Sequence, residues 1–328
     1  IMKSIILTSP LKVMVPIIKI VGDYCNLRCD YCFYNSKNQS VVSIMSDKLL
    51  EKFIEQYMDL FSGNLIFVWH GGEPLLAGMH FFEKVIDIQK KNLKDGQKIQ
   101  NLIQTNATLI DEEWVKFFKK NNFRVGVSLD GDKENHNYFR KNNCGKGSFD
   151  QVMQGIRILR EGGISPGIIQ TLTANNLPHS QKIFKFFTEI LCAKGWGTNT
   201  YLDINNDNLM MIGQSLSNEQ LSNFLISQID LWLERNDKDL DIREIENFIS
   251  PNIGKKSGSC AFNGACTGYF CINYDGKIYP CDRSSGSDKW LLGNISTQSL
   301  DKVLNGEARL KYAELVNKIH PDCVGCEW

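Results

Sequence analysis

The chain has 328 residues, and its 37 lysines and arginines balance its 37 aspartates and glutamates, so the formal net charge is zero. This balance provides no long-range attraction for nucleic acid or for a membrane surface, and we expect neither as a partner. The odd count of eleven cysteines, in a long chain without a signal peptide, favours metal ligation in a reducing, cytoplasmic setting over a disulfide framework.

An apolar run from Val13 to Val21 is the first predicted element. Pro16 and Lys19 interrupt the run, and it is far too short to span a bilayer. We predict it as the first strand. It delivers the chain to a loop with three cysteines, Cys25-Asn26-Leu27-Arg28-Cys29-Asp30-Tyr31-Cys32.

The spacing of these cysteines indicates an iron–sulfur cluster. Cysteine thiolates hold such clusters, and three from one short loop leave one iron of a four-iron cluster without a protein ligand. An open iron points to chemistry rather than to electron storage alone. A zinc knuckle or disulfide partners are the alternatives, but zinc sites present paired cysteine or Cys/His sets, and no histidine lies nearby. We therefore predict a cluster on Cys25, Cys29 and Cys32.

Strand-like and helix-like segments alternate after this loop. A helix capped by Ser46 precedes predicted strands and helices at 65–69, 79–91, 99–104, 111–120, 123–129, 149–160, 168–172, 180–193 and about 198–204. With the first strand, these make six units of a parallel sheet with right-handed crossovers. The pattern fits either a partial barrel or an open doubly wound sheet. A helix over 219–235 closes this region, and a composition shift over 251–258 divides the chain into domains at 10–250 and 251–328.

Short polar residues follow the predicted strands, at the sheet edge where parallel α/β barrels carry their chemistry. They occur in Trp69-His70-Gly71-Gly72-Glu73-Pro74, Gln104-Thr105-Asn106 and Ser128-Leu129-Asp130-Gly131. Glycines at a strand end let a ligand approach the backbone closely. Each motif taken alone also fits an ordinary turn.

A second group of cysteines lies near the C-terminal end of the sequence, at Cys260, Cys266, Cys271, Cys281, Cys323 and Cys326. Asp275-Gly276 predicts a hairpin turn that brings Cys266 and Cys281 together. Regular placement of this kind favours further metal ligation. Cys144 and Cys192 fall outside the pattern and are predicted to be ordinary cysteines.

The first cysteine motif, with an aromatic residue before its third cysteine, resembles the radical S-adenosylmethionine (SAM) enzymes. The resemblance implies a partial (β/α)6 barrel in which SAM chelates the open iron and is cleaved to a 5′-deoxyadenosyl radical. It places Gly71, Gly72 and Glu73 on the amino group of SAM, and Arg140 on its carboxylate, which an arginine fork matches well. It also implies SAM contacts from the strand-end and aromatic residues Tyr31, Asn106, Ser128, Asp130 and Leu202, with Tyr31 and Leu202 toward the adenine.

The C-terminal cysteines resemble the SPASM extension of radical SAM peptide-modifying enzymes. The resemblance implies an auxiliary [4Fe–4S] cluster on Cys260, Cys266 and Cys281 with one more ligand, and a second auxiliary cluster that begins with Cys323 and Cys326. The extension normally continues with further cysteines, whereas this sequence stops at Trp328, so Cys271 is an alternative ligand that would complete one cluster locally. Asp282 is predicted as a general base, with an ion pair to Arg283 as the alternative.

These motifs imply a radical SAM enzyme that modifies a residue of a ribosomally made peptide, for example by a crosslink, and that receives electrons from a flavodoxin or ferredoxin. The alternative is an anaerobic sulfatase-maturating enzyme, which oxidises cysteine or serine to formylglycine. Those enzymes carry glutamine where this chain has His70, a residue that either faces substrate or caps the turn. A non-catalytic iron–sulfur electron carrier is the hypothesis of another class, and the successive strand-end motifs argue against it.

Overall fold

The computed structural model describes residues 13–34, 43–201, 204–205, 210–211, 215–255, 257–260, 264–318 and 324. Ten strands of these ranges form one sheet in the order β12-β11-β10-β1-β2-β3-β4-β5-β6-β9. The strands are β1 (Val15–Lys19), β2 (Asn64–Trp69), β3 (Lys98–Thr105), β4 (Arg124–Ser128), β5 (Gly167–Leu172), β6 (Gly195–Thr200), β9 (Asp241–Ile242), β10 (Tyr269–Asn273), β11 (Lys277–Tyr279) and β12 (Gly293–Asn294), while β7 (Ile204–Asn205) and β8 (Met210–Met211) pair with each other.

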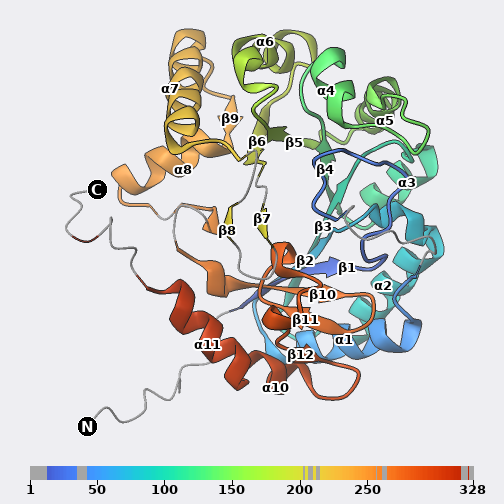
Figure 1. Ribbon diagram of the computed structural model, residues 1–328. Coiled ribbons are helices and arrows are strands. Elements are labelled where there is room, and N and C mark those ends of the chain that lie inside the picture. Colours follow the sequence, from blue (N-terminus) through green and yellow to red (C-terminus); the bar gives the residue numbers. More distant parts are fainter. Residues whose placement is uncertain are drawn as a thin grey trace.

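The helices of the described chain lie mainly on the outer side of the curved sheet (Figure 1). They are α1 (Asp47–Leu60), α2 (Met79–Asn92), α3 (Glu112–Lys120), α4 (Lys133–Phe139), α5 (Phe149–Glu161), α6 (Ser180–Lys185), α7 (Asn218–Arg235), α8 (Arg243–Asn252), α10 (Leu300–Leu304) and α11 (Glu307–Val316). Strands β1 to β6 pair in parallel and in chain order. The predicted partial barrel of alternating strands and helices is thereby confirmed.

The two faces of β2 show how the sequence produces this barrel. Leu65, Phe67 and Trp69 are fully buried on the outer face, where the ring of Phe67 lies 5.0 Å from that of Tyr57 in α1. The intervening residues, including Val68, are only partly buried because they face the barrel interior. Alternate side chains of a strand point to opposite faces, so the same strand supplies the helix-packed core and lines the interior.

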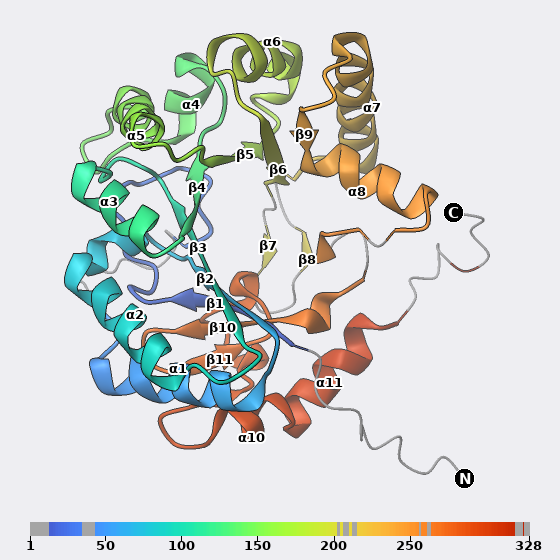
Figure 2. The same cartoon turned by 180° about the vertical axis from the view of Figure 1, so that it is seen from behind.

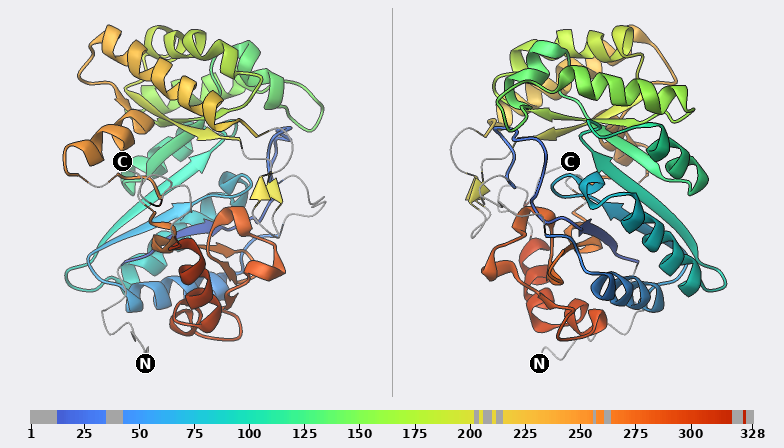
Figure 3. Two further views of the ribbon diagram at one scale, coloured as in Figure 1. Left: turned by 60° about the vertical axis from the view of Figure 1, so that its left-hand side comes forward. Right: turned by 90° about the vertical axis from the view of Figure 1, so that its right-hand side faces the viewer.

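The second cysteine-rich region continues the same sheet. β10 pairs in parallel with β1, so that Lys19 lies opposite Asn273. The hairpin predicted at Asp275-Gly276 is present between β10 and β11, and Gly276 has a φ of +83° there. Figure 2 shows β10 and β11 beside β1. Figure 3 shows this orange and red part of the chain at the sheet edge that lies opposite α7 and α8.

The sixth unit differs from its predicted form. In place of one helix over 180–193, α6 is followed by a π-helical turn, η3 (Phe186–Ile190), and Cys192 then takes a left-handed φ of +48°. Strand β6 begins at Gly195, where a Cβ would lie 2.1 Å from the carbonyl oxygen of Asp241 in β9. Strand β6 pairs closely with β9 at this point, and it begins nearer the N-terminus than the predicted strand does.

No helix in the described ranges is both long and apolar enough to cross a lipid bilayer.

Candidate active site

The cysteine loop crosses the carboxyl end of the barrel and rests on the glycine-rich turn that follows β2. The backbone N–H of Glu73 donates to the carbonyl oxygen of Tyr24 at 2.9 Å. Gly72 has a φ of +53°, and a Cβ on it would lie 2.1 Å from that same oxygen. Glycine at this position therefore allows the loop and the turn to touch.

The three cysteines of the loop open into one cavity of 320 Å³. It is lined by residues from the loop, the strand ends and the turn that follows Cys281: Cys25, Leu27, Cys29, Tyr31, Cys32, Phe33, Tyr34, His70, Gly72, Gln104, Thr105, Asn106, Ser128, Arg140, Ile169, Thr171, Asn199, Thr200, Tyr201, Asp282 and Arg283. The cavity thus joins strand ends that are far apart in the sequence, as the topology of a parallel barrel requires.

The surroundings of the cysteines fit an iron–sulfur cluster. N–H groups point at Cys25 Sγ, from the Leu27 backbone at 3.3 Å and from Asn106 Nδ2 at 3.6 Å. Burial raises the pKa of Cys25 and of Cys29 to about 12, so neither thiol ionises by itself at neutral pH. A bound cation deprotonates a coordinating thiol, and N–H groups aimed at sulfur then stabilise the thiolate.

Glu73 lies behind the cavity wall, and it is 1% exposed. Its carboxylate accepts from Thr105 Oγ1 at 2.8 Å, from the Asn106 backbone at 2.8 Å and from the Leu75 backbone at 3.1 Å. Burial raises the pKa of Glu73 to about 7, although these hydrogen bonds favour the charged form. Its side chain therefore fastens the turn after β2 to the end of β3, and Gly72 of the same turn reaches the cavity.

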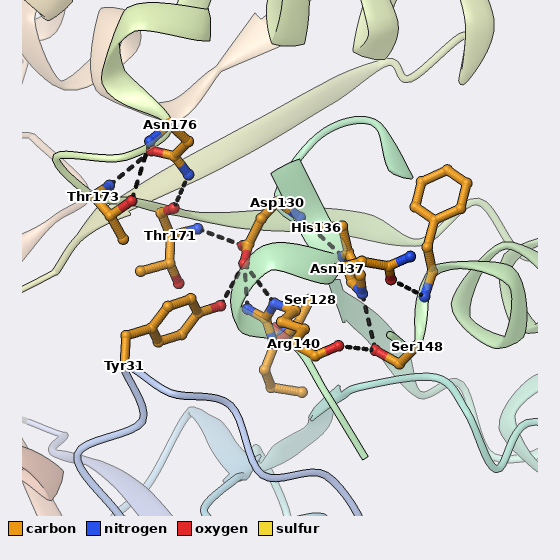
Figure 4. A network of polar contacts seen from close by, with 12 residues as sticks. Tyr31, Ser128, Asp130, His136, Asn137, Arg140, Ser148, Thr171, Thr173 and Asn176 are labelled. Atoms are coloured by element: carbon orange, nitrogen blue, oxygen red, sulfur yellow. Dashed lines mark hydrogen bonds and ion pairs between the residues drawn. The ribbon is translucent and has the colours of Figure 1, made fainter. Parts of the chain in front are cut away.

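A second buried carboxylate, Asp130, organises the opposite wall (Figure 4). It accepts from Tyr31 Oη at 2.5 Å, from Arg140 Nε at 2.8 Å and from the Thr171 backbone at 2.8 Å. The ring of Tyr31 also lies 6.4 Å from that of Tyr201. Asp130 thereby fixes an aromatic surface and a guanidinium that both face the cavity.

The peptide that leads into Asp130 is held by His136. The Asp130 N–H points at His136 Nδ1 at 3.4 Å, His136 Nε2 lies 3.0 Å from Ser148 Oγ, and Ser148 donates to the Arg140 carbonyl at 2.9 Å (Figure 4). Burial lowers the pKa of His136 to about 3, so the ring is neutral. A neutral ring with Nδ1 as acceptor and Nε2 as donor satisfies this whole chain of hydrogen bonds.

Asp282 closes the cavity from the side of the second cysteine group. Tyr34 Oη donates to Asp282 Oδ2 at 3.0 Å and lies 3.4 Å from His70 Nδ1, while Cys281 Sγ lies 3.1 Å from Asp282 Oδ1. Burial raises the pKa of Asp282, but His70, Cys281, Arg283 and Tyr34 together hold it below its ordinary value. A charged, hydrogen-bonded carboxylate therefore faces the three-cysteine loop.

Three of the C-terminal cysteines, Cys260, Cys266 and Cys281, lie near Tyr312, whose pKa is raised by burial and by these cysteines. Trp290 Nε1 beside this ring is buried and has no hydrogen-bond partner among the described residues. An orphaned N–H in the same cluster as Cys266 and Cys271 fits a group with sulfur acceptors. Cys271 is fully buried in β10 and belongs to the same apolar cluster.

Nine of the predicted site residues line the cavity: Cys25, Cys29, Cys32, Tyr31, Gly72, Asn106, Ser128, Arg140 and Asp282. Gly71, Glu73 and Asp130 are not in its lining and support it from behind. Leu202, Cys323 and Cys326 lie outside the described residues. The sequence motifs missed Tyr34 and Tyr201, for which the only sequence signal is that each aromatic residue follows a recognised cysteine or strand end.

Two family models match the chain. Residues 19–179 match the radical SAM superfamily, and residues 260–327 match the SPASM iron–sulfur cluster-binding domain. Together with the cavity and its cysteine loop, these matches define a radical SAM enzyme with a SPASM domain, whose cofactors are SAM and iron–sulfur clusters.

Three relatives narrow this class. The chain is 35% identical over 318 residues to a cysteine-type anaerobic sulfatase-maturating enzyme of Clostridium perfringens. The matched region covers 95% of this chain and 85% of the relative. It is 32% identical to a serine-type enzyme of Bacteroides thetaiotaomicron, with coverages of 98% and 81%. The solved structure of native anSMEcpe with bound AdoMet and Cp18Cys peptide has a TM-score of 0.87 and 35% identity, and it covers 96% of this chain and 86% of its own. The chain belongs to the family of the anaerobic sulfatase-maturating enzymes.

Proposed function

We propose that this enzyme oxidises a cysteine or serine side chain of a sulfatase to formylglycine. The observation that carries the proposal is the position of Asp282, which faces the same cavity as the three-cysteine loop and is held there by Tyr34. The identity with both cysteine-type and serine-type relatives over more than four fifths of their length supports the same substrate class.

The residues of the cavity divide the work of binding. Cys25, Cys29 and Cys32 would hold the cluster, and the Arg140 N–H groups that Asp130 does not use would receive the SAM carboxylate. Tyr31 offers its ring to the adenine. When bound, the cluster and SAM supply a 5′-deoxyadenosyl radical, which takes a hydrogen atom from an unactivated carbon.

The remaining steps need a base and an electron acceptor. Oxidation of the substrate Cβ removes one hydrogen atom, one proton and one electron; Asp282 would take the proton from the substrate thiol or hydroxyl. Cys260, Cys266 and Cys281 would hold the acceptor of the electron directly beside this carboxylate. Serine gives the aldehyde at once, whereas cysteine gives a thioaldehyde that water converts to the aldehyde with release of hydrogen sulfide.

Crosslinking of a ribosomally made peptide is the second candidate, and His70 is the observation that favours it. This histidine lies in the cavity wall beside Tyr34. Burial lowers the pKa of its imidazole, although the nearby Asp282 carboxylate raises it. A second peptide side chain placed against His70 would meet the carbon that has lost its hydrogen atom.

The test uses enzyme reconstituted anaerobically with iron and sulfide, supplied with SAM and dithionite. Its substrates are a sulfatase peptide with cysteine at the modified position and two matched peptides with serine or alanine there. We expect 5′-deoxyadenosine and an aldehyde that reacts with a hydrazide reagent from the cysteine or serine peptide only. A product that loses two hydrogens, keeps its sulfur and resists the hydrazide would instead establish crosslinking. Absence of 5′-deoxyadenosine in every sample would leave only the electron-carrier hypothesis.

We also propose that the enzyme works in the cytoplasm and that a flavodoxin or ferredoxin supplies its electron there. The eleven cysteines of the sequence, most of them proposed as cluster ligands, support a reducing compartment. Replacing dithionite with reduced flavodoxin tests the donor, because formation of 5′-deoxyadenosine must then be accompanied by oxidation of the flavodoxin.

A further inference from the structure

Lys19, the last residue of β1, is a charged side chain in the protein interior with 1% exposure. A buried ammonium is stable only when it is paired and hydrogen-bonded. Its Nζ donates to Asp23 Oδ1 at 2.5 Å and to Ser285 Oγ at 3.1 Å. It also lies 4.1 Å from the centroid of the Tyr34 ring, a cation–π contact.

The aliphatic stem of Lys19 fills the space under the glycine-rich turn. Gly71 has a φ of +80°, and a Cβ on it would lie 2.4 Å from Lys19 Cγ. The contact at Ser285 continues into β10, because Ser285 Oγ donates to Asn273 Oδ1 at 3.0 Å. One side chain therefore touches the cysteine loop, the turn after β2 and the segment that follows Cys281.

Lys19 does not line the cavity, but Tyr34, on which its charge rests, does. The Tyr34 hydroxyl in turn donates to Asp282 at 3.0 Å. We propose that Lys19 is a positioning residue: its ammonium holds the Tyr34 ring so that the Tyr34 hydroxyl keeps Asp282 aimed into the cavity. The role of Asp282 in this inference rests on the proposed function.

The contacts explain why a cation is needed at this place. Asp23 balances its charge on the side of the cysteine loop, and the electron-rich face of Tyr34 receives it on the side of the cavity. An apolar residue of the same length would fill the volume but would leave the ring without this attraction. Tyr34 would then be free to turn away from Asp282, while the cysteines would keep their places.

The test compares Lys19→Met with the wild type. We expect the yield of oxidised peptide per 5′-deoxyadenosine, and kcat for peptide oxidation, to fall on the order of tenfold, because a small misplacement of a reacting group has effects of at least this size. The KM for SAM should stay within about twofold, since methionine keeps an aliphatic stem against Gly71 and the proposed SAM contacts of Tyr31 and Arg140 lie on the opposite wall. Tyr34→Phe should show the same fall, and the double variant no further fall, because both changes break one chain of contacts.

Two further variants complete the design. Lys19→Gln keeps an N–H donor for Asp23 and Ser285 but puts no cation on the ring, so it should lose as much yield as Lys19→Met; it also serves if the methionine variant does not fold. Lys133→Met removes an exposed lysine from a 2.7 Å ion pair with Asp150 and should leave the yield at the wild-type value. Wild-type yield in Lys19→Met or Lys19→Gln, or multiplying losses in the double variant, would overturn the proposal.

A separate measurement covers failure of the proposed function. If the wild type modifies no peptide, crystal structures of the reconstituted wild type and Lys19→Gln still decide the role of Lys19. We expect the Tyr34 hydroxyl to leave hydrogen-bond distance of Asp282 in the variant only. A retained hydrogen bond in the variant would contradict the inference.

Discussion

Asp130 and Arg140 form a two-point ion pair behind the cavity, with Nε 2.8 Å from Oδ2 and Nη2 3.3 Å from Oδ1. Asp130 is fully buried, and Arg140 is 8% exposed. Burial lowers the pKa of Arg140, but Asp130, Tyr31 and Cys29 together raise it by more, so the guanidinium stays charged. Asp130, which the family resemblance places on SAM, therefore also orients the guanidinium of Arg140 in the cavity wall.

Replacing Asp130 with asparagine should therefore damage both stability and SAM binding. The change leaves a buried guanidinium without its counter-charge, which costs about 3–5 kcal/mol. We expect the free energy of unfolding to fall by about that amount and the Kd for SAM to rise. Urea unfolding and calorimetric SAM titration under anaerobic conditions measure the two effects. Asp150→Asn, which breaks an exposed pair, should change stability by about 1 kcal/mol or less; equal losses in both variants would contradict this account.

Gly72→Ala should displace the cysteine loop. The added Cβ would lie 2.1 Å from the Tyr24 carbonyl oxygen, so we expect a large loss of bound iron after reconstitution. Gly78 is the matched control, because it also has a positive φ, +81°, but nothing lies within 4 Å of its Cβ position. Gly78→Ala should cost about 1–3 kcal/mol of backbone strain and keep its iron. The same iron content in both variants would argue against the contact.

The buried neutral His136 should make the fold sensitive to acid. Its pKa is about 3 in the folded chain and near 6.5 when unfolded, so the unfolded state binds the extra proton between these values. The contribution of His136 to the free energy of unfolding is therefore fully present above pH 6.5 and is lost as the pH falls below it. Lowering the pH from 7.5 to 5.5 should therefore reduce the free energy of unfolding by about 1.4 kcal/mol through this group. The difference in urea stability between the two pH values should shrink by that amount in His136→Gln, and an unchanged difference would show that His136 does not titrate in this way.

Cys29→Ala should abolish SAM cleavage and remove only the iron of the first cluster. Cys260, Cys266 and Cys281 lie near Tyr312, apart from the first cysteine loop, and we expect them to bind their own iron independently of it. Iron and sulfide analysis, together with a 5′-deoxyadenosine assay, measures both effects. Cys144 is exposed and outside both cysteine groups, so Cys144→Ala should behave as the wild type. SAM cleavage by the Cys29 variant would refute the assignment of the loop.

The alternation of strand-like and helix-like segments predicted a parallel sheet, and the resemblance of the cysteine motif to the radical SAM enzymes predicted that this sheet forms a partial barrel. The sequence also predicted most of the cavity wall, since side chains at the ends of parallel strands meet at one edge. The pairing of β10 with β1 joins Ile18 to Ile272. No local pattern encodes contact over such a separation.

The supporting charges of the site escaped prediction for a related reason. In the sequence Lys19 only interrupts an apolar run. The fold shows that Asp23, Ser285 and Tyr34 surround it. The resemblance placed Glu73 on the ligand, and only the fold shows that its carboxylate also accepts three hydrogen bonds from the chain itself. Motif positions identify the wall of a site, whereas the residues that hold the wall depend on tertiary contacts.

The most direct test of the account follows a hydrogen atom. Reconstituted enzyme would receive SAM, dithionite and a sulfatase peptide whose cysteine carries deuterium at Cβ. The account predicts that deuterium appears in 5′-deoxyadenosine while the peptide gains an aldehyde. Formation of 5′-deoxyadenosine without deuterium, alongside an oxidised peptide, would show that the cavity does not bring the substrate carbon to SAM.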